Sequence, residues 1–205
     1  MTWEDEQQVI RISCATLNRM RYSDGRYLLV LNKNQMQNGM RVLTPIGGAS
    51  HYNDPSILQA LGVHLEQENS RDLRFYIDER RAKEFETWFL TKQGREIDPF
   101  RELYEEIVLE ERLLGNLDRQ DINIKSLGLV TKRDRSTRDP VTHAWTKFYF
   151  EVFEIDFPEL SWKKMLRGIE RAEHNAKLVS KKEIQSGRTI DGIKIGSNCL
   201  ALFQI

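Results

Sequence analysis

Cysteine is scarce in this 205-residue sequence, which has two, Cys14 and Cys199, near opposite ends of the chain. Each lies among apolar residues in a strand-like setting, so core packing is favoured for both, and a single pair implies no disulfide scaffold. The four histidines are far apart and have no cysteine companions, so no zinc-binding spacing is visible. The sequence therefore favours a fold that depends on an ordinary hydrophobic core.

Net charge is also lacking, because 31 lysines and arginines balance 31 aspartates and glutamates. This balance argues against bulk nucleic-acid binding. Long apolar runs are missing too: a run such as 27–31 is far shorter than the ~18 residues that a bilayer span needs. No signal-peptide pattern follows Met1. We therefore expect a cytoplasmic protein with no membrane segment in this chain.

Strand-like and helix-like segments follow one another along the chain. Residues 9–17 and 27–31 flank a Ser-Asp-Gly turn, which predicts a hairpin. Further strands are expected at 41–44, 73–77, 122–130, 143–155, 177–179 and 199–203, and helices at 55–61, 80–92, 98–114, 158–175 and 181–186. The order has no strict βαβ repetition, so it predicts a mixed-sheet α/β sandwich. The length predicts one domain over residues 1–205.

The helix expected after Asp98-Pro99 carries three glutamates on one face. Glu102, Glu105 and Glu106 lie at positions i, i+3 and i+4, which gathers them within about 100° of the helix surface. Like charges at this spacing repel by a few tenths of a kcal/mol per pair. A magnesium ion would offset this repulsion, because it prefers carboxylate oxygens. The alternative is a solvated helix face, neutralised by neighbouring arginines and lysines.

The same helix resembles part of a known motif. Residues Arg101-Glu102-Leu103-x-Glu105-Glu106 are similar to the second half of the Nudix box, which follows a glycine, five residues, a glutamate and seven residues. The first half resembles Pro45-Ile46-Gly47-Gly48, with Asp54 at the place of the first glutamate. Between Asp54 and Arg101 lie 46 residues instead of seven, so we expect residues 55–96 to be an insertion within the box. Val108 stands at the usual glycine position.

Within the Nudix hydrolase superfamily, the layout is most similar to the SMODS-associated Nudix domains of bacterial antiviral defence. The resemblance implies a Nudix-like α/β/α sandwich with a long insertion inside the box. It also implies that Glu102, Glu105 and Glu106 bind Mg²⁺ or Mn²⁺, with Glu102 and Glu106 as catalytic residues. Arg101 would have a structural role, through an ion pair that fixes the helix to the Gly-Gly loop.

Substrate contacts are expected outside this helix. The resemblance assigns Gly47 and Gly48 to substrate binding. Arg11, Trp145 and Lys147 lie on predicted strands and could present a cation and an aromatic platform to a base and a phosphate, the alternative being core packing. A basic loop could gather phosphate or be merely solvated. Its cations are Lys132, Arg133, Arg135 and Arg138.

The resemblance leaves two functions open. The first is a magnesium-dependent hydrolase that cleaves a phosphoanhydride in a nucleotide, a nucleoside diphosphate linked to another group, in bacterial antiphage defence. The alternative is a non-hydrolysing Nudix-fold sensor that binds a cyclic or linear nucleotide messenger. The intact glutamate trio favours hydrolysis, whereas the insertion and the missing first glutamate favour sensing. In both cases we expect a nucleotide ligand, and a homodimer because Nudix proteins are often dimers.

Overall fold

The computed structural model describes residues 9–135, 145–170 and 175–205. The strands are β1 Val9–Arg19, β2 Tyr27–Leu31, β3 Val42–Thr44, β4 His64–Leu65, β5 Arg74–Asp78, β6 Asn123–Arg135, β7 Trp145–Asp156, β8 Ala176–Val179 and β9 Lys194–Ile195. The α-helices are α1 Lys33–Gln37, α2 Ser56–Leu61, α3 Ala82–Thr91, α4 Phe100–Tyr104, α5 Glu159–Glu170 and α6 Lys181–Ser186. A π-helix, η2, spans Glu105–Glu110, and 3₁₀ helices are η1 Glu79–Arg81, η3 Arg119–Asp121 and η4 Ser197–Phe203.

The described strands form two sheets. One has the strand order β4-β5-β1-β7-β6, in which β5 pairs antiparallel with both β4 and β1. The other has the order β8-β2-β3-β9. In this sheet β2 is antiparallel to β3 and β8, whereas β3 is parallel to β9. The combination of a mixed sheet with helices confirms the expected α/β class.

The chain divides into two compact units. The first unit comprises Met1–Ala15, Ala49–Asp98 and Val130–Phe150, and the second comprises Thr16–Gly48, Pro99–Leu129 and Glu151–Ile205. Strands β1, β6 and β7 contribute residues to both units. The segment 55–96 falls wholly within the first unit. Its origin as an insertion in a single 1–205 domain stays a prediction.

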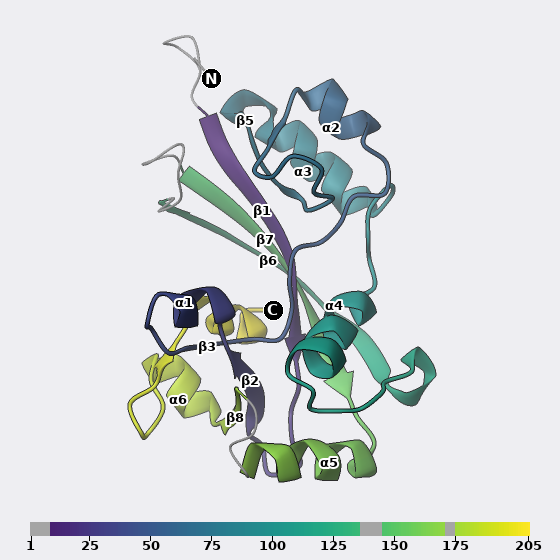
Figure 1. Cartoon of the computed structure of the whole chain (residues 1–205). Coiled ribbons are helices and arrows are strands. Elements are labelled where there is room, and N and C mark those ends of the chain that lie inside the picture. Colours follow the sequence, from purple (N-terminus) through teal and green to yellow (C-terminus); the bar gives the residue numbers. More distant parts are fainter. Residues whose placement is uncertain (1–8, 136–144, 171–174) are drawn as a thin grey trace. The chain divides into compact units, whose positions relative to one another are not determined.

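In the first unit, helix α3 presents one apolar face to the sheet. Ala82, Phe85 and Phe89 recur at the spacing of one helix face, and all three are buried. The Phe85 ring lies edge-on to Phe75 of β5, with centroids 5.1 Å apart, and to Tyr149 of β7, at 5.7 Å. Figure 1 shows α3 alongside α2. The helices predicted at 55–61 and 80–92 are observed as α2 and α3. Tyr149 belongs to the core.

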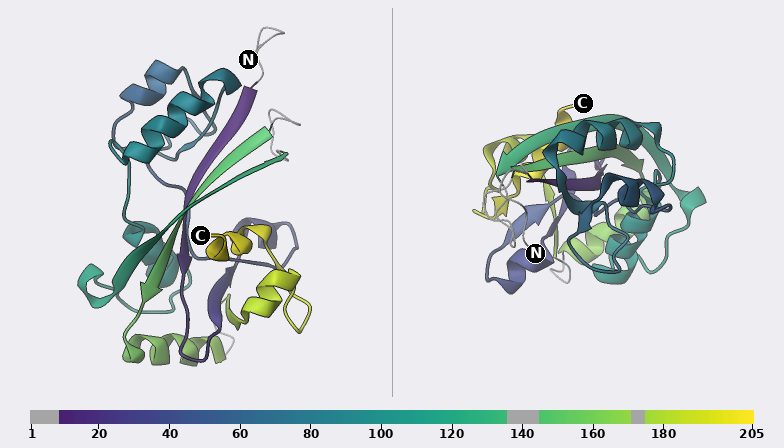
Figure 2. Two further views of the ribbon diagram at one scale, coloured as in Figure 1. Left: turned by 180° about the vertical axis from the view of Figure 1, so that it is seen from behind. Right: turned by 90° about the horizontal axis from the view of Figure 1, so that it is seen from above.

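In the second unit, the core gathers around α4, η2 and α5. Leu103 and Ile107, four residues apart, are fully buried and share a hydrophobic cluster with Ile46. Trp162 and Met165 of α5 join the same cluster. At the other end of the chain, η4 contacts α6 (Figures 1 and 2). The apolar residues Leu103 and Ile107 of the α4–η2 segment therefore pack into the core of this unit.

The helix expected at 98–114 differs from the prediction. Helix α4 ends at Tyr104 and continues as the wider π-helix η2 to Glu110. Two consecutive residues of this π-helix, Ile107 and Val108, are buried. Arg112, with φ of 51°, then turns the chain out of the helix. Pro99 holds the N-cap position of α4.

The C-terminal strand predicted at 199–203 is also wrong. These residues form the 3₁₀ helix η4, because β9 occupies the place beside β3 and the terminal segment bonds within itself. Cys199, Ala201 and Leu202 are still buried, which is what made the segment resemble a strand. The short elements α1, β4 and β9 were not predicted. His143, at the start of the predicted strand 143–155, and residues 171–174 of the predicted helix 158–175 lie outside the described residues.

Candidate functional site

A Gly-Gly turn and the α4–η2 helix form the candidate site in the second unit. Ile46, immediately before the turn, packs in one cluster with Leu103 and Ile107 of the helix. Because Glu102 and Glu106 are the sequence neighbours of these two buried residues, this packing brings their carboxylates to the turn. The hydrophobic face of the helix thus positions its acidic face.

Two of the three glutamates face the turn directly. The Gly47 N–H donates to Glu106 Oε2 over 3.0 Å. The Glu102 carboxylate lies against Gly48, where a β-carbon would overlap with Glu102 Oε2. A β-carbon on Gly47 would overlap with the Thr16 carbonyl, and Gly47 has φ of 147°. Gly47 is therefore required by the close approach of the Thr16 backbone, whereas the absence of a β-carbon at Gly48 leaves the space that the Glu102 carboxylate occupies.

Arg101 supplies the counter-charge for the other carboxylates. Its Nη1 lies 2.8 Å from Glu102 Oε1 and 3.1 Å from Glu105 Oε2. The Glu105 side chain is 43% exposed, so this glutamate faces Arg101 and solvent. Arg101 thus pairs with Glu102, which itself contacts Gly48; the structural role that the resemblance implies for Arg101 stays a prediction. The ion pair also offsets part of the repulsion between the glutamates without a metal ion.

Glu106 has an unusual acidity. Burial, together with the nearby charges of Glu102, Glu110 and Glu111, raises the pKa of its carboxyl to about 8, although the Gly47 N–H acts in the opposite direction. Among the described residues, no lysine or arginine forms an ion pair with Glu106. The site thus holds more negative charge than its own cations neutralise.

Glu110 and Glu111 are parts of this environment that the sequence reasoning missed. Lys33 Nζ lies 2.8 Å from Glu110 and 3.7 Å from Glu111, and the Glu111 side chain is 4% exposed. The signal was present, since these two acids follow the Nudix-like motif by one helical turn. The Nudix-like motif ends before these two acids, so the resemblance assigned them no role.

Comparison with known protein families shows to which family the chain belongs. The profile of the SMODS-associated NUDIX domain family matches residues 9–203. The chain belongs to this family. The match confirms the resemblance expected from the split motif and supports the Nudix-like fold. No curated protein and no solved structure matches the chain.

Nudix domains typically use divalent metals. The question for this SMODS-associated NUDIX domain is whether its carboxylates could bind such an ion. The described residues contain no ready-made group of three or more His, Cys, Asp or Glu side chains for a metal ion. Magnesium is commonly held by one or two carboxylates together with substrate phosphates and water. Glu102 and Glu106 fit this mode, because their carboxylate oxygens are the ligand atoms that magnesium prefers. The two side chains lie at adjacent glycines, and the negative charge around Glu106 is not fully neutralised.

Asp54, at the place of the family's first glutamate, belongs to the first unit of the NUDIX domain. Its Oδ1 accepts a hydrogen bond of 2.9 Å from the Ser56 N–H at the start of α2. This bond lowers the pKa of the Asp54 carboxyl. The residue therefore has a local role at the start of α2.

The remaining substrate-binding candidates, Arg11, Trp145 and Lys147, also lie in the first unit. Arg11 is buried and forms an ion pair with Glu66. Lys147 Nζ lies 2.5 Å from Glu86 Oε2 on α3. The guanidinium groups of Arg133 and Arg135 lie 4.9 and 4.2 Å from the centre of the Trp145 ring. The structure thus brings the glycines and glutamates together in one unit and these three residues into the other.

The basic loop and the membrane expectation can also be checked in part. Lys132, Arg133 and Arg135 belong to strand β6. Arg138 lies outside the described residues. In the part of the chain that the structure describes, no helix combines the length and apolarity needed to span a membrane.

Proposed function

We propose that this SMODS-associated NUDIX domain is a divalent-cation-dependent hydrolase that cleaves a phosphoanhydride bond in a nucleotide. The observation that supports it best is the approach of two glutamates, Glu102 and Glu106, to the Gly47-Gly48 turn. A solvated acidic face would not place the Glu102 carboxylate against Gly48 or bring Glu106 within hydrogen-bond distance of the Gly47 N–H. The substrate class is a nucleoside diphosphate linked to another group, as the family resemblance implies.

The charged residues of the candidate site would have different roles in this hydrolysis. Glu102 and Glu106 would hold Mg²⁺ or Mn²⁺, with Glu105 as a third carboxylate, and the ion would supply neutralisation of negative charge on the phosphoryl oxygens. Arg101 forms an ion pair with Glu102 through Oε1. The other oxygen, Oε2, faces Gly48 and is the group that would accept a proton from the attacking water.

The test is hydrolysis of a panel of nucleoside diphosphate derivatives by the full chain in Mg²⁺ and in EDTA. We expect turnover only with the metal, and a loss of at least ~100-fold in Glu102→Gln and Glu106→Gln, because each removes a charged carboxylate. Glu105→Gln should lose less, since its side chain is the exposed one. Glu159→Gln, at an 81% exposed glutamate, is the charge-matched control. Turnover that persists in EDTA and in both variants would contradict the proposal.

A second candidate, a non-hydrolysing nucleotide sensor, is favoured by one specific observation. Arg101 lies beside both Glu102 and Glu105 and offsets part of their charge in the absence of a cation. The sensor predicts that a nucleotide raises the melting temperature in EDTA without being turned over. Metal-dependent turnover would decide against it. A place in bacterial antiviral defence and a homodimer stay predictions under either candidate.

A further inference from the structure

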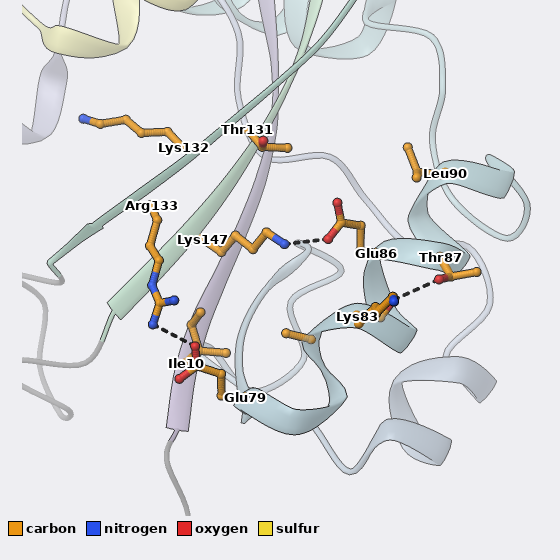
Figure 3. Close-up of a pocket in the computed structure, with 11 residues that line it drawn as sticks. Ile10, Glu79, Lys83, Glu86, Thr87, Leu90, Thr131, Lys132, Arg133 and Lys147 are labelled. Atoms are coloured by element: carbon orange, nitrogen blue, oxygen red, sulfur yellow. Dashed lines mark hydrogen bonds and ion pairs between the residues drawn. The ribbon is translucent and has the colours of Figure 1, made fainter.

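The first unit contains a pocket of about 690 Å³ whose lining comes from that unit. Helix α3 forms one wall, and strands β1, β6 and β7 form the other (Figure 3). The volume lies within the range of ~300–1,000 Å³ that is typical of small-molecule sites. The pocket is therefore large enough for an organic ligand and is built partly by the segment expected to be an insertion.

Two ion pairs cross this pocket. Arg133 Nη2 of β6 lies 2.7 Å from Glu79 Oε1, and Lys147 Nζ of β7 lies 2.5 Å from Glu86 Oε2 (Figure 3). The side chains of Arg133 and Lys147 are 46% and 26% exposed, and those of Glu79 and Glu86 are 25% and 33% exposed. Ion pairs that water reaches contribute little to stability, so their partners can be exchanged at low cost.

Positive charge is in excess around the pocket. Its lining includes four cationic side chains, those of Lys83, Lys132, Arg133 and Lys147, against two carboxylates, Glu79 and Glu86. Among the described residues, Lys83 on α3 forms no ion pair. Lys132 extends away from α3 in Figure 3 and pairs with Asp134, so Lys83, Arg133 and Lys147 are the relevant cations. An anion that displaced both carboxylates would find cations on both walls.

The remaining lining is partly apolar. Ile10, Ala82 and Leu90 line the pocket, and Leu90 is 58% exposed although it belongs to a helix with a well-packed apolar face. An inorganic anion would leave this surface in water, whereas a ligand with a ring or chain would cover it. The lining therefore suits a molecule that is anionic at one end and apolar at the other.

We propose that this pocket binds a small organic phosphate, with Arg133 and Lys147 exchanging Glu79 and Glu86 for phosphate oxygens. Arginine is suited to phosphate because its planar guanidinium can donate two parallel hydrogen bonds, and the lysine adds a compact charge. Leu90, which is 58% exposed, would contact the apolar part of the ligand. This site goes beyond the proposed hydrolysis, because it requires neither a metal ion nor the glutamates of the Nudix-like motif.

Calorimetric titration of the full chain with ADP in EDTA tests the proposal, with pyrophosphate as the probe that lacks an apolar part. EDTA removes the cation-dependent hydrolysis from the measurement, so failure of this site and failure of the proposed function are distinguishable. We expect ADP to bind more tightly than pyrophosphate. Arg133→Gln and Lys147→Gln should each weaken ADP binding by roughly tenfold, the loss of one charge-assisted hydrogen bond. Leu90→Ser should weaken ADP but leave pyrophosphate unchanged.

Substitution of the two pocket carboxylates, Glu79 and Glu86, should have the opposite effect on the affinity for ADP. Glu79→Gln and Glu86→Gln remove the competing partners, so each should tighten ADP binding by about threefold or more. Glu84→Gln on the same helix, where Glu84 pairs with Arg81 and does not line the pocket, should have no effect. Melting temperatures of every variant identify any that fail to fold. Absent ADP binding up to 10 mM, roughly the weakest affinity of interest, or binding that all five pocket variants leave unchanged, would overturn the proposal.

Discussion

Glu106 places a carboxyl group in a partly buried position beside other acids. Its ordinary pKa of 4.5 applies in the unfolded chain, whereas burial and the neighbouring Glu102, Glu110 and Glu111 raise it to about 8 in the folded, metal-free protein. Between these values the folded protein binds a proton that the unfolded chain has lost. The contribution of Glu106 to stability is therefore complete below pH 4.5 and is lost as the pH rises through about 8.

Glu106→Gln should remove this pH dependence. The amide oxygen can still accept the Gly47 N–H bond, but it carries no charge, so the variant in EDTA should be more stable than the wild type at pH 8.5 and equal to it near pH 4.5. We expect a gain of at least ~1 kcal/mol, or about 2–4 °C in melting temperature. Thermal denaturation across pH, with Glu159→Gln as control, measures it. A difference that stays constant with pH would contradict the raised pKa.

Gly47 and Gly48 should respond differently to alanine. At Gly47 a β-carbon meets the Thr16 backbone and the φ of 147° is unfavourable for alanine, so Gly47→Ala should cost about 2–4 kcal/mol. At Gly48 it meets the end of the Glu102 side chain, which can rotate away, so the cost should be below ~1 kcal/mol. Urea denaturation of both variants separates the two cases. Equal destabilisation would show that Glu102 is held more rigidly than its geometry implies.

At the scale of elements, the α4–η2 segment combines packing and acidity in consecutive residues. The widened turn of η2 buries both Ile107 and Val108 while Glu105 and Glu106 remain on the side of the turn and solvent. Val108, at the family's glycine position, is 9% exposed and belongs to the hydrophobic cluster of the second unit. The departure from the Nudix motif is therefore used for core packing.

Val108→Gly, which restores the usual motif residue, should consequently be harmful. It removes a buried side chain, worth ~1.5–3 kcal/mol, and adds the backbone entropy of glycine, worth ~0.5–1 kcal/mol. We expect a loss of about 2–4 kcal/mol in the free energy of unfolding by urea. Leu109→Ala, at the neighbouring 58% exposed position, should change it by less than ~0.5 kcal/mol. A neutral or stabilising Val108→Gly would show that the helix relaxes to a different winding.

At the scale of the whole molecule, the chain crosses between the two units along β1, β6 and β7. Each unit is therefore made of three separate stretches of sequence, and neither corresponds to a continuous piece of chain. Folding either unit fixes one part of each of these strands. We consequently expect the protein to unfold in a single cooperative transition.

Paired conservative substitutions test this cooperativity. Ile77→Val in the first unit and Ile107→Val in the second both shorten a fully buried side chain, and each should cost about 0.5–1.5 kcal/mol. Both should lower the same calorimetric transition, with equal van't Hoff and calorimetric enthalpies. A variant that splits the transition, moving one part and leaving the other, would show that the units unfold separately.

The candidate site was predictable to the extent that it depended on local pattern. The spacing of Glu102, Glu105 and Glu106 and the Gly-Gly pair were visible in the sequence, and so was the apolar face containing Leu103 and Ile107. The π-helical winding of η2 was not predictable, because the hydrophobic pattern of this segment is equally compatible with an ordinary α-helix. It was also not predictable that Lys147 and Trp145 belong to a different unit from the glutamates, because the division into units depends on contacts between distant parts of the chain.

The order of residues alone established the family, the α/β class and which face of the Nudix-like helix is acidic, since these follow from motif spacing and hydrophobic period. It did not establish how each acid is used. Glu105 pairs with Arg101 near solvent, whereas Glu106 is drawn in beside Gly47 and becomes a weak acid. That difference arises from burial and from the charges gathered around each carboxylate, and these exist only once the chain has folded.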